Sequence, residues 1–276
     1  MEFETTLILD LDERNLAHFL SALTLAALAG RIEGNAHESR HCWWPEPGHF
    51  AIQTEHPRNE FRALLFAKAH SFLTALEWYP GLGGVEHGVI ASGEEMGVNP
   101  FVPLNGDGDE RPLLRAFSAK VVPQNVLPQQ KAELRTPSEC SAWLDQLASG
   151  AGRRVKDGVS SWGYDYRVNI HASDAGISSD AEGTGRLDPI YPAIELLSLA
   201  GAAYFSPAHA WTSEGGKLCV AAWTEPLLLG LAALASSGRV HGLPFRNLTF
   251  LPRGGAHGKG GSFRFFPPAT IQPSTP

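Results

Sequence analysis

Hydrophobic and polar positions recur with two different periods along the chain, and these periods predict its first elements. Residues 2–9 alternate weakly and are β-prone, which predicts an opening strand. Residues 16–28 are apolar around most of a helical circumference, so we expect a buried helix that ends at Gly30. Asp10 and Asp12 come just before this segment, and either side chain could cap the helix.

A strand and an amphipathic helix are predicted next. Phe50, Ile52 and Thr54 alternate with their neighbours after a turn rich in Pro and Gly, which is typical of a strand. Across residues 59–78 apolar side chains recur at the helical spacing, and charged side chains lie between them. We expect this second helix to stop before Pro80, because proline cannot continue a helix.

The middle of the chain is rich in Gly and Pro and gives weaker signals. Residues 99–111 resemble an exposed loop. Asp107, Asp109 and Glu110 have the composition of a calcium loop, but the glycine and distal glutamate of an EF-hand are missing, so a solvated turn is favoured. A short helix is predicted over residues 137–148.

The second half of the chain is organised around residues 164–207. A strand-like run at 164–170 leads through a loop of Asp, Ser and Gly to a dense apolar segment at 190–205, which predicts a buried helix. Further on, residues 219–223 predict a strand and residues 227–235 predict a helix that starts after Pro226.

The end of the chain predicts more strands and then disorder. Residues 240–251 fit one or two strands, and the Pro-rich tail from Pro267 is expected to be disordered. Tandem repeats are absent from the sequence, but residues 23–30 and 195–203 are similar apolar segments that each follow a polar turn. This similarity is weak support for two related halves.

Together these elements predict an α+β fold in which antiparallel sheets pack on buried apolar helices. Two ferredoxin-like halves are one arrangement that fits the order of elements. The expected domains are an N-terminal α+β half at 1–110, a linker region with a short helix at 111–160, a C-terminal α+β half at 161–266 and a disordered tail at 267–276.

Composition supports a globular cytoplasmic protein. Hydrophobic residues make up 43% and charged residues 18% of the 276 positions, which suffices for a sizeable core. The apolar run at 16–29 is too short to span a membrane, and we expect no secretory signal. Cys42, Cys140 and Cys219 lie far apart and form no CxxC pair, which indicates a reducing compartment.

Charge is unevenly distributed along the chain. The formal net charge is −7, which argues against a general nucleic-acid binder, but the last acidic residue is Glu225. The final 51 residues therefore hold five formal positive charges and no negative ones: Arg239, Arg246, Arg253, Lys259 and Arg264. Such asymmetry indicates a local anion-facing surface on an otherwise acidic protein.

A glycine-rich basic segment lies inside this acid-free region. Five glycines occur between Gly254 and Gly261, and Arg253, Lys259 and Arg264 flank or interrupt them. The pattern is neither a P-loop nor a dinucleotide fingerprint. Glycines let backbone N–H groups approach a phosphate closely, and the cations supply charge, so contact with a nucleic-acid backbone is one interpretation. A flexible hairpin turn is the alternative.

The candidate nucleic-acid-binding residues extend beyond this segment. They are Arg246, Arg253, His257, Lys259 and Arg264, with Arg167 and His171 from the central region. A purely structural role for His171 fits the sequence equally well. The basic run of Arg153, Arg154 and Lys156 fits either a solvated linker or a phosphate contact, and we favour the linker.

Catalytic chemistry finds little support in the sequence. Asp165, Asp174, Asp180, Glu182 and Asp188 could form a metal-dependent nuclease site, but acidic residues in a Gly/Ser-rich loop are more typical of turns and caps. The serines show no GxSxG elbow. We therefore assign no catalytic residue and expect no cofactor.

A histidine cluster near the N-terminus also invites a metal interpretation. It consists of His37, His41, Cys42, His49 and His56. The spacing matches no established zinc pattern, and two adjacent tryptophans lie within the cluster. A packed aromatic turn is favoured, and no metal site is predicted.

Three stretches of the chain resemble one protein family. They are LDLDERNLAHFLSALTLAAL near the N-terminus, DAGISSDAEGTGRLDPIYPAIELLSLAGAAYFSP in the middle and RGGAHGKGGSFRFF near the C-terminus. The first resembles a strand, Asp-rich turn and small-residue helix, the second an aspartate-containing loop before a Pro-Ala-x-Glu-Leu-Leu helix, and the third an Arg/Gly/Lys-rich loop. All three features are similar to an accessory, large-subunit-like protein of type I-G (formerly type I-U) CRISPR-Cas effector systems.

This resemblance implies a non-catalytic subunit of an antiviral ribonucleoprotein in the cytoplasm. Its partners would be guide RNA, target DNA or both, together with other CRISPR-associated subunits. No membrane contact is expected. In such complexes guide pairing supplies sequence specificity, while protein contacts read the backbone and the shape. Two alternatives stay open: an endonuclease that processes repeat RNA into guides, and a scaffold that binds only proteins.

Overall fold

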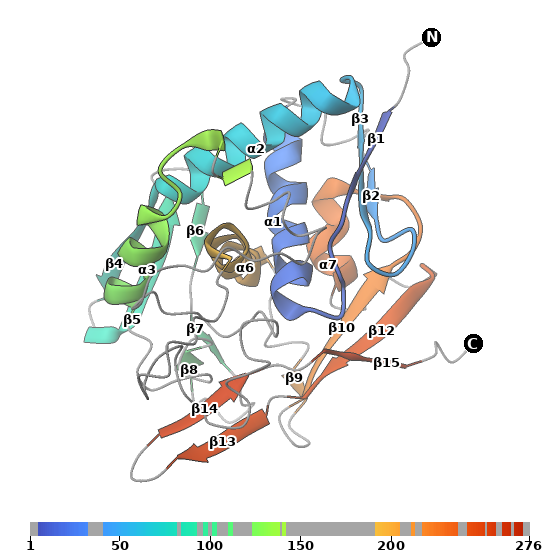
Figure 1. The fold of residues 1–276 in the computed structure, drawn as a ribbon. Helices are drawn as coiled ribbons and strands as arrows, with labels where there is room; N and C mark the ends of the chain where they lie inside the picture. Colours follow the sequence, from blue (N-terminus) through green and yellow to red (C-terminus); the bar gives the residue numbers. More distant parts are fainter. Residues whose placement is uncertain are drawn as a thin grey trace, which may run out of the picture.

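The computed structural model describes fifteen segments of the chain. They are residues 5–32, 41–81, 84–92, 96–98, 101–103, 110–112, 123–138, 140–141, 191–204, 211–212, 217–236, 242–251, 253–257, 261–265 and 268–272. Within them, helices and antiparallel sheets enclose a hydrophobic core, which confirms the predicted α+β class (Figure 1). None of the helices in these segments combines the length and hydrophobicity that a membrane crossing requires.

The first sheet joins the start of the chain to a distant segment. It contains β1 (Thr5–Leu9), β2 (His41–Trp43), β3 (Phe50–Thr54) and β11 (Leu227–Leu228), in the antiparallel order β1-β3-β2-β11. The opening strand and the strand that begins at Phe50 are therefore confirmed. The short β11 pairs with β2, so a C-terminal segment completes an N-terminal sheet.

A second sheet is built by the C-terminal part of the chain. Its order is β15-β12-β10-β9, with β9 (Trp211–Thr212), β10 (Lys217–Trp223), β12 (Phe245–Phe250) and β15 (Thr270–Gln272). The predicted strands β10 and β12 are confirmed. The prediction of disorder from Pro267 onward is wrong for β15, because β12 offers that segment a free edge with which it pairs.

Two smaller sheets follow the second helix. One has three antiparallel strands, β4 (Leu76–Gly81), β5 (Gly84–Ser92) and β6 (Met96–Val98). The other pairs β7 (Phe101–Pro103) with β8 (Glu110–Pro112). The expected loop at 99–111 thus contains most of a strand pair, which its Gly- and Pro-rich composition concealed.

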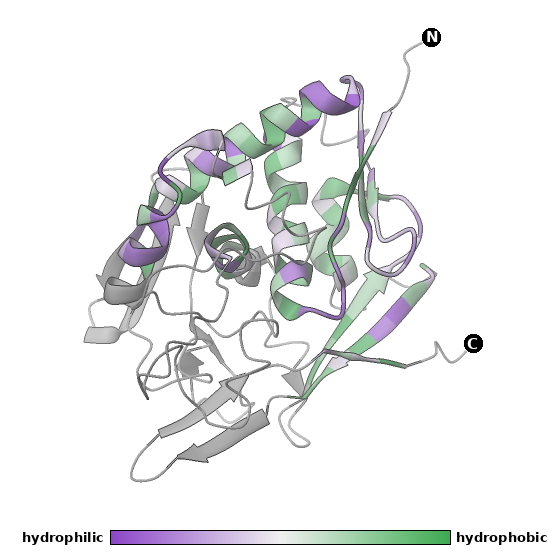
Figure 2. Ribbon diagram, viewed as in Figure 1, coloured by the Kyte–Doolittle hydropathy of each residue, from purple (hydrophilic) through white to green (hydrophobic). Residues whose placement is uncertain are grey.

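The structure describes six helical elements, and α1 and α6 lie at the centre of the view (Figure 1). They are α1 (Leu16–Ile32), α2 (Arg58–Thr74), α3 (Pro123–Ala132), α6 (Pro192–Tyr204), the 3-10 turn η3 (Leu229–Leu231) and α7 (Ala232–Ser236). Colouring by hydropathy shows α1 as largely apolar, whereas α2 carries polar patches (Figure 2). The buried and amphipathic helices expected here are both confirmed.

Helix ends differ from the sequence-based expectation. Gly30 does not end α1, because the helix includes it as a buried residue and continues to Ile32. Helix α2 ends at Thr74 rather than Trp78, because the next residues form β4 and pair with β5. Pro80 belongs to that strand, which is an edge strand in the described sheet, where proline is tolerated.

The predicted helix at 227–235 is wrong in its first half. Leu227 and Leu228 form β11 opposite Cys42 and His41, and a 3-10 turn then leads into the short α7. Pairing with β2 overrides the helical propensity of the leucine-rich segment, as tertiary context often does.

The cap of α1 is neither of the two aspartates expected. Asn15 Oδ1 accepts a hydrogen bond from the backbone N–H of Ala17 at 3.1 Å, which is an N-cap interaction. Asp12 instead shapes the preceding turn, because its Oδ1 accepts the Arg14 backbone N–H at 3.0 Å. The turn and the helix start are therefore fixed by different side chains.

Helices α1 and α6 pack closely enough for their backbones to approach each other. The Ser21 hydroxyl donates to the Ile194 carbonyl at 3.1 Å, and the Thr24 hydroxyl donates to the Leu197 carbonyl at 2.8 Å. A Cβ atom at Gly201 would lie 1.9 Å from the carbonyl oxygen of Leu20. Small and hydroxylated residues therefore hold this central pair together.

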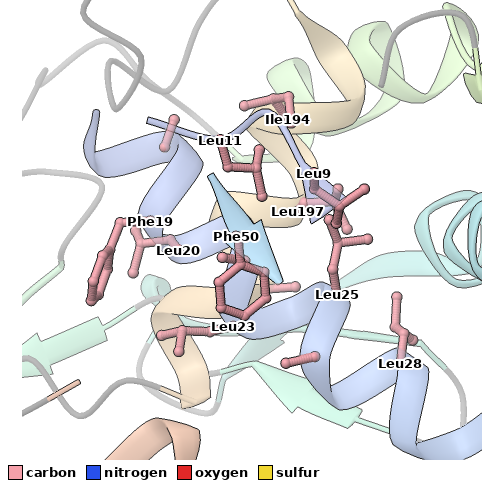
Figure 3. Close-up of a cluster of buried hydrophobic side chains, with 14 of the residues drawn as sticks. Leu9, Leu11, Phe19, Leu20, Leu23, Leu25, Leu28, Phe50, Ile194 and Leu197 are labelled. Carbon is pink, nitrogen blue, oxygen red and sulfur yellow. The ribbon is translucent and has the colours of Figure 1, made fainter. Parts of the chain in front are cut away.

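Leucines from both central helices and aromatic side chains from the first sheet fill the core (Figure 3). The labelled members are Leu9, Leu11, Phe19, Leu20, Leu23, Leu25, Leu28, Phe50, Ile194 and Leu197.

Of the expected helix at 137–148, the structure describes helical residues at 137–138 and 140–141. The strand expected at 164–170 and the loop that follows it lie outside the described residues.

Candidate nucleic-acid interface

The last strands of the acid-free end of the chain lie together at one end of the view (Figure 1). The chain has 22 basic and 29 acidic residues, and five of the basic but none of the acidic residues follow Glu225. Residues 1–225 therefore carry a formal charge of −12 and residues 226–276 a charge of +5. Strands β12 and β15 and the hairpin described next, orange to red in Figure 1, lie in the lower part of the view.

The glycine-rich basic segment forms a two-stranded hairpin. Strand β13 (Arg253–His257) pairs antiparallel with β14 (Gly261–Phe265), and the register is continuous along all five residue pairs. Lys259, which lies between the two strands in the sequence, is outside the described residues. The prediction of a hairpin in this segment is therefore confirmed for the backbone. Contact with phosphate stays a prediction.

The register separates the candidate cations between two faces of this β13–β14 hairpin. Arg253 is opposite Phe265, and Gly255 is opposite Phe263. Residues that are directly opposed share a face, and every second residue along a strand returns to it. Arg253, Phe263 and Phe265 therefore belong to one face together with His257, whereas Arg264 belongs to the other.

Among the described elements, the hairpin lies apart from the central helices. Figure 1 places it below them, and β13 and β14 pack chiefly on each other within the described part of the chain. Leu251, one residue before Pro252 and the hairpin, exposes 42% of its surface. The hairpin thus follows β12 of the second sheet along the chain.

Arg246 has a different environment from the hairpin. Its Nε and Nη2 atoms both lie 3.0 Å from Oε1 of Glu13, and Nη2 also donates to the Trp44 carbonyl at 3.4 Å. The side chain of Glu13 is fully buried, and that of Arg246 is 18% exposed. We therefore leave Arg246 out of the proposed interface, because its guanidinium is engaged inside the fold.

Glu13 is the residue that sequence reasoning missed. Its Oε2 accepts the Gly48 backbone N–H at 2.8 Å, so one carboxylate binds β12 and the β2–β3 connection to the turn before α1. Glu13 and Arg246 are 233 positions apart. No local pattern could have paired them.

A neighbouring junction uses tryptophans instead of charges. The Trp223 indole Nε1 donates to the Cys42 carbonyl at 2.6 Å, and the Trp44 backbone N–H donates to the Trp223 carbonyl at 2.9 Å. Trp44 also stacks on Phe19 with ring centroids 5.8 Å apart. The aromatic-turn interpretation of this segment is therefore confirmed for Trp44.

The histidines of that segment have separate partners. His41 Nδ1 lies 2.7 Å from Gln53 Oε1, and His49 Nε2 lies 3.3 Å from Asp10 Oδ1. Within the residues that the structure describes, no group of three or more His, Cys, Asp or Glu side chains is arranged to hold a metal ion. His37 lies outside these residues.

The remaining sequence candidates cannot be placed. Arg167 and His171 lie outside the described residues, as do the basic run at 153–156 and the aspartates of the central loop. Of the seven candidate nucleic-acid-binding residues, the structure thus brings Arg253, His257 and Arg264 together on one hairpin and separates Arg246 from them.

Comparisons with models of known families, with curated proteins and with solved structures found no match. The fold defines the class of the protein, which is an α+β protein with two central helices, several antiparallel sheets and a basic hairpin.

Proposed function

We propose that the protein is a non-catalytic subunit of a type I-G CRISPR antiviral ribonucleoprotein. In this role it contacts the backbone of guide RNA or target DNA in the cytoplasm and binds neighbouring CRISPR-associated subunits. The observation that carries the proposal is the β13–β14 hairpin, a Gly-rich element with Arg253 and Arg264 in an acid-free part of the chain.

The chemistry of the hairpin suits a phosphate backbone. Glycines at 254 and 255 leave the backbone of β13 accessible to a close approach, and Arg253 and Arg264 supply charge that carries no base specificity. Lys259, between the two strands in the sequence, adds a third cation. The charge of −12 on residues 1–225 disfavours nucleic acid elsewhere on the protein, so binding is directed to this end.

The family resemblance supports the same role. Two of the three resembling stretches contain α1 and α6, the helices that pack together through Ser21, Thr24 and Gly201. The third stretch contains the β13–β14 hairpin. The resemblance thus falls on the centre of the fold and on the element with the strongest case for ligand contact.

A cleavage and binding assay tests the proposal against its alternatives. The purified protein is incubated with labelled repeat RNA and Mg²⁺, with EDTA as the matched control, and both bound and cleaved RNA are measured. We expect bound, intact RNA. Specific cleavage products would contradict the subunit role and favour the repeat-RNA endonuclease. The absence of any binding to RNA or DNA would instead favour a scaffold that contacts only proteins.

A further inference from the structure

We draw no further inference here: the strongest candidate, the exposed face of helix α2 that carries Ala63, Leu64, Ala67 and Ser71, is a surface of mostly small side chains, and nothing in the described part of the structure shows what covers it.

Discussion

Glu13 and Arg246 form an ion pair between residues that lie 233 positions apart in the sequence. From the sequence, Arg246 is one of five cations in an acid-free region. In the fold it is the only described partner that brings a full positive charge to the buried Glu13 carboxylate. The charge of a carboxylate that is buried away from water must be balanced by a partner of opposite charge. Arg246 supplies that charge, so it stabilises the junction between β12 and the turn before α1.

Substitution of Arg246 by alanine should therefore destabilise the protein without a specific effect on nucleic acid. We expect a loss of about 3 kcal/mol in the free energy of unfolding, because Glu13 would remain buried with an uncompensated charge. Denaturant unfolding measures the loss, and Arg135→Ala, at an exposed position, is the control. Adding Glu13→Ala should recover part of the stability, and strictly additive losses would argue against a coupled pair.

Burial of the Cys140 thiol is expected to lower the stability of the folded protein at alkaline pH. Burial raises the pKa of its thiol from 9.0 to about 12, so the folded protein keeps this proton while the unfolded chain loses it above pH 9. The contribution is fully present below pH 9 and is lost as the pH rises toward 12. When the pH rises from 9 to 10, the free energy of unfolding should fall by about 1 kcal/mol less in Cys140→Ala than in wild type. Denaturant unfolding at the two pH values measures this difference. Parallel pH profiles would contradict this assignment.

Among the elements, the contact between α1 and α6 depends most on a single small residue. Gly201→Ala would place a methyl group against the Leu20 backbone carbonyl, which cannot move without displacing α1. We expect a cost of about 3 kcal/mol or more, because overpacking here forces two helices apart. Gly230→Ala is the matched control, since a Cβ at Gly230 meets nothing within 4 Å. Equal thermal stability of the two variants would rule out the close approach.

The elements with a strong internal period were predictable from sequence, and those fixed by distant pairing were not. The buried face of α1 surrounds most of the helix, so its apolar pattern sufficed. Residues 76–78 of strand β4 are predicted as the end of the preceding helix, because Leu76 and Trp78 fit both periods until the pairing with β5 is known. Strand β15 was expected to be disordered because its Pro-rich surroundings conceal a partner, β12, that lies some twenty residues earlier.

The candidate site was predictable to a similar extent. Glycines and cations between Arg253 and Arg264 indicated a hairpin or a phosphate contact, and the hairpin is present. The sequence did not show which residues share a face, because that depends on the register of β13 against β14. It also could not separate Arg246 from this group, since the partner that engages Arg246 lies at the other end of the chain.

At the scale of the whole molecule, formal charge divides along the chain, although the two parts share both larger sheets. The acidic part of the chain, residues 1–225, contributes both central helices, the first three strands of the first sheet and strands β9 and β10 of the second. The basic remainder contributes β11, η3, α7, β12, the hairpin and β15. A net charge of −12 on one part and +5 on the other gives the protein a strong electrostatic asymmetry. Within a ribonucleoprotein, this asymmetry would orient the hairpin toward the nucleic acid.

The salt dependence of binding tests this central claim most directly. The affinity of wild type and of the Arg253→Ala/Lys259→Ala/Arg264→Ala variant for single-stranded RNA is measured between about 50 and 200 mM salt, because each phosphate contact releases counterions. If the hairpin contacts the backbone, the slope of log K against log salt should become shallower by about 2 for the three lost cations. A slope that is unchanged from wild type would show that the nucleic acid binds elsewhere and would contradict the account.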